Sequence, residues 1–341
     1  MRYLFELNHP KHYYQFKYVM LKLKQAGHEI MVVARDKDVL LKVLQEEKVP
    51  YEIFGKHSKT LSGKLFGTIP ILFSYNRIIR RFRPDVIVSK ASFYAALLAK
   101  INRIKSVIFP DSEVVKVTNR YVVPLVTKVV TPDTFGLDYG KKHIRVKGLF
   151  EDCYLSPTVF TPDESVVERY GLKRPYAIFR FVGWSANHDV GNNGFSLDQK
   201  IQLTRAVDGK MNVYISSEKP LPPELLNCRL PVPASLMHHA LAFADLYLGD
   251  SQTMATEASL LGTPAIRSNS FVGEHDMTNF KVLEHKYGLL RNVAKFDEVL
   301  TLVKDFSSNS RKNEWRAKRA DYYSETGDLN QAIVDILMDC Q

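Results

Sequence analysis

The stretch from Asp250 to Pro264 has the residue types and spacing of a nucleotide-binding turn. A short apolar strand ends in Asp250 and Ser251, and a helix is predicted to begin near Thr253. The backbone N–H groups at a helix start, together with the hydroxyls of Ser251 and Thr253, suit the charge of a diphosphate. Glu257 lies one helical turn after Thr253, where its carboxylate can accept hydrogen bonds from ribose hydroxyls. Simple capping of a core helix explains the same residues, and this alternative stays open.

A second candidate segment, from Arg180 to Asp189, passes from an apolar strand into a loop that contains Gly183 and Trp184. The side chains of Arg180 and His188 are suited to neutralising the charge on a diphosphate leaving group. A single histidine in a loop also fits an ordinary polar surface residue, so both interpretations of His188 stay open.

Three loops in the first half of the chain each follow a predicted strand, and they comprise residues 8–12, 89–92 and 110–113. Because the carboxyl ends of parallel strands meet at one edge of a sheet, we expect these loops to converge. Asp111, Glu113 and His9 are then candidates for a general base that takes a proton from a hydroxyl group. Each of them also fits a turn former, a helix cap or a member of an ion pair.

Short apolar strands alternate with segments of helical periodicity along the chain, which predicts parallel sheets covered on both faces. In the first half the predicted strands are 3–7, 29–34, 51–54, 85–89, 106–109 and 129–131. In the second half they are 176–181, 212–216, 246–249 and 265–266, with a predicted helix over 198–206. Residues 148–162 lack periodicity and precede a new apolar strand, so we place a domain junction there. The predicted fold class is α/β, with two doubly wound Rossmann-like lobes, residues 1–155 and 156–341, facing a central cleft.

Composition narrows the class of protein. Of the 341 residues, 45% are hydrophobic and 25% are charged, as in ordinary globular chains. No run approaches the roughly 20 apolar residues of a membrane-spanning helix, and no leader precedes the first strand, so a cytoplasmic location is expected. The three cysteines lack partners at metal-ligand spacing, and the glycine-rich nucleotide motifs are absent. We therefore expect no metal and no bound cofactor.

Charge is divided unevenly between the two halves. Residues 1–150 hold 27 Lys and Arg against 12 Asp and Glu, whereas residues 151–341 hold 20 against 25. The first lobe is therefore expected to meet an anionic partner. Within it, residues 64–84 place apolar side chains beside four arginines, a combination suited to peripheral contact with an anionic inner membrane surface. A core-facing helix with a solvated basic face explains the same pattern.

Several of these motifs together resemble a known family. The spacing of Asp250-Ser251, Glu257-Ala258 and Gly262-Thr263-Pro264 is similar to the sugar-nucleotide motif of GT-B glycosyltransferases and of UDP-N-acetylglucosamine 2-epimerases. Further segments resemble the bacterial and archaeal domain-of-unknown-function-354 family over nearly the whole chain. These segments are 9–10, 26–29, 35–36, 109–113, 184–189 and 262–269.

The resemblance implies a GT-B glycosyltransferase that takes a nucleotide-diphosphate sugar, most simply a UDP-sugar, and needs no metal. Its acceptor would be an anionic or lipid-linked molecule in cell-surface polysaccharide or glycolipid synthesis. The implied donor-binding residues are Arg180, Gly183, Trp184, Val232, Pro233, Met237, Asp250, Ser251, Gln252, Thr253, Glu257 and Arg267. The candidate catalytic residues are His188, Asp111, Glu113 and His9.

Two alternatives remain at this point. The first is a UDP-N-acetylglucosamine 2-epimerase or hydrolase, although Lys90-Ala91 stands where the first epimerase acid aligns, and residues 267–276 replace a stretch typical of epimerases. The second is a non-catalytic basic binding protein. Nucleic acid is a disfavoured partner, because no RNA-binding aromatic motif or helix-turn-helix signature is present.

Overall fold

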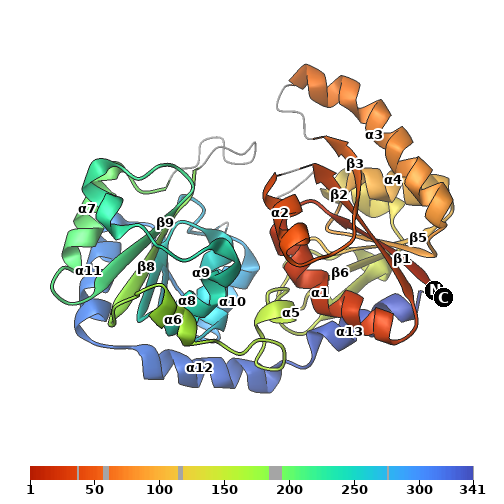
Figure 1. Ribbon diagram of the computed structural model, residues 1–341. Coiled ribbons are helices and arrows are strands. Elements are labelled where there is room, and N and C mark those ends of the chain that lie inside the picture. The colour runs from red at the N-terminus through yellow and green to blue at the C-terminus, as the bar shows by residue number, and fades with distance from the viewer. Residues whose placement is uncertain (37, 57–60, 114–117, 184–193, 275, 341) are drawn as a thin grey trace. The chain divides into compact units, whose positions relative to one another are not determined.

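The computed structural model describes residues 1–36, 38–56, 61–113, 118–183, 194–274 and 276–340 (Figure 1). The chain forms two compact units. The first comprises Met1–Tyr154 with Gly327–Gln341, and the second comprises Leu155–Thr326.

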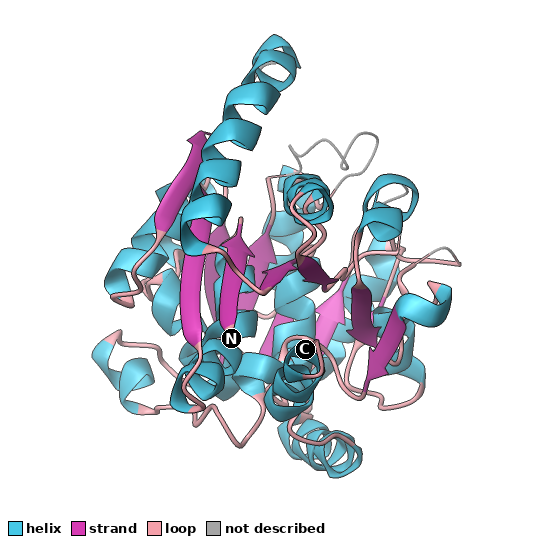
Figure 2. Cartoon of the chain, turned by 90° about the vertical axis from the view of Figure 1, so that its right-hand side faces the viewer, coloured by secondary structure: helices cyan, strands magenta, loops and turns pink. Residues whose placement is uncertain are grey.

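The first unit is a seven-stranded parallel sheet with the strand order β3-β2-β1-β4-β5-β6-β7. Its strands are β1 (Arg2–Leu7), β2 (Glu29–Asp36), β3 (Glu52–Lys56), β4 (Val86–Ser89), β5 (Lys105–Ile108), β6 (Lys128–Pro132) and β7 (His143–Val146). Its helices are α1 (Pro10–Gln25), α2 (Asp38–Glu46), α3 (Leu61–Phe82), α4 (Phe93–Ile101) and α13 (Leu329–Met338), while α5 (Asp152–Leu155) lies at the junction with the second unit. Helices cover both faces of the sheet (Figure 2), as expected for parallel strands joined by crossover helices.

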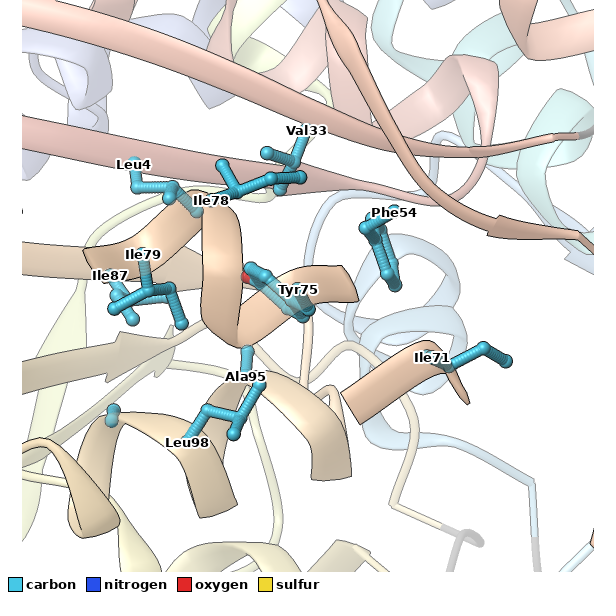
Figure 3. Packing of buried hydrophobic residues seen from close by; sticks show 11 residues of the cluster. Leu4, Val33, Phe54, Ile71, Tyr75, Ile78, Ile79, Ile87, Ala95 and Leu98 are labelled. Atoms are coloured by element: carbon cyan, nitrogen blue, oxygen red, sulfur yellow. The ribbon is translucent and has the colours of Figure 1, made fainter. Parts of the chain in front are cut away.

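The face of this sheet beneath α3 and α4 carries an apolar core. Along α3, Ile71, Tyr75, Ile78 and Ile79 recur at helical spacing and are buried, and they pack over Leu4 and its neighbours in the sheet. Figure 3 shows these side chains together. Because side chains alternate along a strand, Glu6 is the next residue of β1 on the same face as Leu4.

The second unit is a five-stranded parallel sheet with the order β12-β11-β10-β8-β9. Its strands are β8 (Tyr176–Phe181), β9 (Asn212–Ser217), β10 (Leu246–Gly249), β11 (Ala265–Arg267) and β12 (Arg291–Asn292). Its helices are α6 (Ser165–Arg169), α7 (Leu197–Ala206), α8 (Met237–Phe243), α9 (Gln252–Leu260), α10 (Thr278–His285), α11 (Phe296–Ser308) and α12 (Lys312–Glu325). Short helical turns complete the chain at Thr118–Val122, Val123–Leu125, Gly140–Lys142, Pro223–Cys228 and Ala234–Leu236.

The end of the chain differs from the expected division at residue 155. After α12 the backbone returns to the first unit, where α13 packs on α1. Lys22 binds Asp328 at 3.1 Å, and the side-chain amide of Asn330 donates to the backbone oxygen of Cys153 at 3.0 Å. The assignment of all of residues 156–341 to one lobe therefore does not match these contacts, because the terminal helix buries its apolar face against the first unit.

Candidate functional site

Each sheet has a topological switch point, where neighbouring strands send their connections to opposite faces. In the second unit this point lies between β8 and β10, and in the first unit between β1 and β4. Ligands of open α/β sheets bind outside the carboxyl ends of the strands at such points. The candidate residues from the sequence follow these strands or their neighbours.

The start of α9 follows β10 directly. Ser251 is its N-cap, and the Ser251 Oγ accepts a hydrogen bond from the backbone N–H of Met254 at 3.3 Å. The first turn of α9 carries no acidic residue, so no side chain there offsets the positive end of the helix. Gln252 and Thr253 are partly exposed at this turn. Capping and anion binding are compatible here, because one cap satisfies only one of the N–H groups that a helix start leaves unpaired.

Glu257 lies further along α9 and contacts α8. Its Oε1 is 3.2 Å from Nε2 of His238, and the two side chains are 11% and 16% exposed. His238 directly follows Met237, the first residue of α8, and the loop before it holds Val232 and Pro233. The structure therefore links Glu257, through His238, to the segment to which the resemblance assigns donor binding.

Arg180 lies near the end of β8, and an acidic residue holds its side chain. Its guanidinium donates to the Ser216 hydroxyl at 2.8 Å and to Glu218 at 2.7 Å. The second oxygen of Glu218 accepts the backbone N–H of Gly183 at 2.9 Å. The Arg180 side chain is 21% exposed, so Glu218 orients a guanidinium that still reaches solvent.

Asp250 is buried and connects strand ends. Its Oδ1 accepts the backbone N–H of Val182 at 2.8 Å, and its backbone oxygen accepts a hydrogen bond from the Asn269 side chain at 3.0 Å. At Gly249, just before it, a Cβ atom would lie 2.6 Å from the Tyr247 hydroxyl. A side chain there would therefore displace the neighbouring strand ends.

Arg267 lies inside the second unit and is fully buried. Its guanidinium forms an ion pair with Asp276, which is 3% exposed, and stacks on the Phe280 ring at 3.6 Å from the centroid. The contacts observed for Arg267 are thus structural, and they anchor the segment after β11.

In the first unit, Asp111 follows β5 and meets two lysines. Its Oδ2 is 3.2 Å from Lys90 Nζ and 3.5 Å from Lys11 Nζ, and Lys11 also binds Glu151 at 2.8 Å. Burial alone would raise the pKa of Asp111, but the ammonium groups of Lys90 and Lys11 outweigh it and hold that pKa well below its ordinary value. Asp111 is therefore ionised at neutral pH and is a weak proton acceptor.

The other two candidate bases of the first unit have local contacts. Glu113 accepts the backbone N–H of Gly136 at 2.5 Å. His9 is the N-cap of α1, where its Nδ1 accepts the backbone N–H of Lys11 at 3.1 Å. Trp184 and His188 lie outside the described residues, among which no group of three metal-ligating side chains gathers.

Sequence reasoning missed three charged or titratable residues that the structure places beside candidates: Glu6, Glu218 and His238. Glu6 offered a visible signal, because it is a charged residue inside an otherwise apolar strand. Glu218 follows the predicted strand that ends at Ser216, which is a position typical of binding residues. His238 gave no signal, since its contact with Glu257 joins residues from separate helices.

Solved structures with a similar fold include an epimerase and a glycosyltransferase. The UDP-GlcNAc 2-epimerase from Methanocaldococcus jannaschii aligns with a TM-score of 0.67 and 15% identity, over 99% of each chain. Spinosyn rhamnosyltransferase SpnG, complexed with spinosyn aglycone, aligns with a TM-score of 0.66 and 12% identity, over 99% of this chain and 100% of that one. The protein is thus an α/β protein with a GT-B-like fold, which confirms the predicted fold class.

The sequence comparison finds a family for the first part of the chain. Residues 3–148 match the family described as "Protein of unknown function (DUF354)", the family that the motifs of the sequence resemble. An uncharacterised protein from Methanocaldococcus jannaschii is 22% identical over 278 residues, which cover 76% of this chain and 80% of the relative.

A second relative is an N-acetylglucosamine transferase. The UDP-N-acetylglucosamine–N-acetylmuramyl-(pentapeptide) pyrophosphoryl-undecaprenol N-acetylglucosamine transferase of Clostridium novyi is 26% identical over 129 residues. The match spans 35% of this chain and 36% of that enzyme.

Proposed function

We propose that the protein is a metal-independent glycosyltransferase that moves a sugar from a nucleotide-diphosphate donor, most simply a UDP-sugar, to an anionic or lipid-linked acceptor. The observation that carries the proposal is the switch point of the second unit. There a helix start with no acidic residue in its first turn, the carboxylate of Glu257 and the oriented guanidinium of Arg180 follow neighbouring strands. These groups match the diphosphate and ribose of such a donor.

In this reaction an acceptor oxygen attacks the anomeric carbon of the donor. The bond from that carbon to the diphosphate breaks, and the diphosphate leaves with the electron pair. The N–H groups at the start of α9, the Thr253 hydroxyl and Arg180 would stabilise the charge that develops on the leaving group. The acceptor's proton passes to a base, and the described candidates for it in the first unit are Glu113 and His9, because Asp111 is held ionised by two lysines.

Epimerisation is the second candidate, and the similarity to the 2-epimerase fold favours it. An epimerase removes and returns a proton on carbon, which requires a basic group whose pKa suits that transfer. The observed Asp111 is held ionised by two lysines and is a poor match. Incubation with UDP-N-acetylglucosamine alone separates the two, because an epimerase converts the sugar without an acceptor.

The first prediction concerns donor binding. We expect UDP to raise the melting temperature of the protein by roughly 5–10 °C at a concentration about 100-fold above its Kd, by mass action on the folded second unit. The measurement is a thermal-shift panel of nucleoside diphosphates and their sugars. A chain that responds to none of them would contradict the proposal and favour the non-catalytic binding protein.

A surface of the first unit supports an acceptor at a membrane. On α3, the exposed residues Ile69, Phe73, Arg77 and Arg81 follow at four-residue spacing, and we call them the α3 stripe; Arg81 also pairs with Glu52. Ile69 and Phe73 are 62% and 73% exposed. The described part of the chain contains no helix long and apolar enough to cross a membrane. An apolar and cationic stripe instead suits the surface of anionic phospholipids.

Vesicle binding tests the α3 stripe. We expect the protein to co-sediment with phosphatidylglycerol-containing vesicles more than with pure phosphatidylcholine, and binding to fall as salt rises. Arg77→Ala should weaken it about fivefold, since each cation near the surface is worth about 1 kcal/mol. Phe73→Ser should weaken it too, whereas Phe93→Ser, an exposed phenylalanine on α4, is the matched control. Equal binding by the Phe73 and Phe93 variants would exclude the stripe.

A further inference from the structure

Arg35, at the carboxyl end of β2, is held in place by aromatic rings. Its guanidinium carbon lies 4.8 Å from the centroid of the Tyr94 ring and 5.9 Å from that of Phe54. Among the described residues it forms no hydrogen bond or ion pair, and its buried Nε has no acceptor. A guanidinium that is oriented by stacking and lacks a carboxylate partner is prepared to bind an anion.

Beside it lies a buried carboxyl group that is also incompletely paired. Glu6 is 1% exposed, and its Oε1 accepts a hydrogen bond from the Asn8 side chain at 2.6 Å. Glu6 Oε2 and the Tyr75 hydroxyl are buried without a hydrogen bond of normal geometry, but they lie near each other. Asn8 Oδ1 and Arg35 Nε are buried and have no partner in the described part of the chain. Unpaired buried polar atoms are costly, so these two indicate a missing partner.

The cluster lies at the topological switch point of the first unit. Glu6 and Asn8 are at the end of β1, and the loop after β4 approaches them with Ser92, whose hydroxyl lies near the Glu6 carboxyl. In that loop Ala91 has a φ of +127°, a conformation that residues other than glycine rarely adopt. Backbone strain of this kind concentrates at binding sites.

The electrostatics of Glu6 favour its neutral form, which is compatible with an anion in the cluster. Burial raises the pKa of Glu6, against the opposing effects of Asn8, Ser92, Arg35 and Tyr75. A protonated Glu6 can donate a hydrogen bond, and it does not cancel the charge of Arg35. The groups that act on Glu6 are Asn8, Ser92, Arg35 and Tyr75, and none of these is a second carboxylate.

We propose that Arg35, Asn8 and Glu6 form a subsite for an oxyanion flanked by hydroxyl groups, carried by the acceptor saccharide. This inference rests on the proposed transferase function and names the chemistry of its acceptor. Arg35 binds the oxyanion through its planar fork of N–H groups, and Asn8 with Glu6 binds an adjacent hydroxyl. The oxyanion is either the carboxylate of an acidic sugar or the phosphate of a sugar phosphate.

Side-chain NMR of the ¹⁵N-labelled full chain tests the subsite. The Nε–Hε signal of Arg35, assigned by its loss in Arg35→Lys, should shift on addition of D-glucuronate or α-D-glucose 1-phosphate. Methyl α-D-glucopyranoside, which is neutral, should leave it in place at equal ionic strength. A shift with glucuronate indicates that the subsite binds the carboxylate of an acidic sugar. A shift with glucose 1-phosphate indicates that it binds the phosphate of a sugar phosphate. A signal that ignores both anionic probes, or moves equally with the neutral one, overturns the proposal.

Variants provide the second measurement. Arg35→Met should weaken binding of the responding probe at least about tenfold, whereas Arg120→Met, which removes an exposed arginine stacked on Tyr121, should not. Unchanged affinity in Arg35→Met overturns the subsite. The thermal response to UDP should survive in both variants, because Arg35 belongs to the first unit. If UDP does not raise the melting temperature of the wild-type chain, the proposed donor site is contradicted. Failure of the Arg35 subsite and failure of the donor site are therefore distinguishable.

Glu6→Gln separates function from stability. A folded-state pKa raised above the unfolded value means that the unfolded chain loses this proton first, so wild-type stability falls as pH rises above the ordinary range of glutamate. Glu6→Gln should abolish that fall and raise the melting temperature at neutral pH. Asp152→Ala should lower the melting temperature, because it removes the acceptor of the Leu149 backbone N–H, which Asp152 binds at 2.8 Å. A Glu6→Gln variant that melts below wild type at neutral pH would show that the carboxyl is a structural partner and would overturn its role.

Discussion

Asp276→Ala is expected to destabilise the second unit by about 3–5 kcal/mol, because it leaves the charge of Arg267 buried without a partner. Arg267 has no exposed surface, and its Nε and Nη1 already lack acceptors in the described part of the chain. No rearrangement of an exposed side chain would bring water to this guanidinium at small cost. Urea unfolding of the full chain, followed by tryptophan fluorescence, measures the change, since Trp315 is buried in the same unit.

Two controls define this effect. The double variant Arg267→Met with Asp276→Leu should recover most of the loss, because an apolar pair replaces a buried ion pair at little cost. Glu325→Ala removes one partner of the exposed Lys286–Glu325 pair and should cause no measurable change. If Asp276→Ala unfolds at the wild-type urea concentration, Arg267 is not held by this pair, and a direct role in donor binding becomes its better explanation.

The arrangement of the strands was predictable because each combines an apolar run with polar ends. The predicted strand 246–249 matches β10, and the predicted helix from Asp198 to Ala206 matches α7 with one residue added. Local sequence carried this information, since a strand buried on both faces admits few polar residues. The unit that receives α13 was not predictable in the same way. The sequence of α13 shows an apolar face but not the sheet that this face covers. The packing of α13 on α1 places it in the first unit.

For the candidate site, too, the sequence predicted the topology but not the contacts between distant residues. Topology alone predicted that the loops after the strands meet at one edge, and the contacts of Asp111 with Lys90 and Lys11 agree with this. Which charges pair was not predictable. Lys90 and Asp111 are 21 positions apart in the sequence, and one lysine converts a candidate base into an ionised member of an ion pair. Glu6 shows the opposite case, because its burial without a cation partner appears only after the chain has folded.

Glu257→Ala is expected to weaken UDP binding by about 10- to 100-fold in calorimetry, because hydrogen bonds to a charged group contribute roughly 1.5–3 kcal/mol. The side chain is mostly buried beside His238, so water cannot replace it well as an acceptor for ribose hydroxyls. Glu284→Ala is the matched control in the same unit. That carboxylate binds the Asn292 backbone and side chain at 3.0 and 2.9 Å, so its loss should lower stability and leave UDP affinity unchanged.

The ligand supplies the decisive comparison for Glu257. Deoxyuridine diphosphate lacks the 2′-hydroxyl, so wild-type protein should bind it more weakly than UDP, and Glu257→Ala should lose less affinity for it than for UDP. If the Glu257 carboxylate only supports the fold, Glu257→Ala should weaken the binding of both ligands by the same factor. Equal losses, or an unchanged UDP affinity in Glu257→Ala, would remove the ribose contact from the donor site. The helix start and Arg180 would then have to account for nucleotide binding, and they recognise a diphosphate without selecting the sugar attached to it.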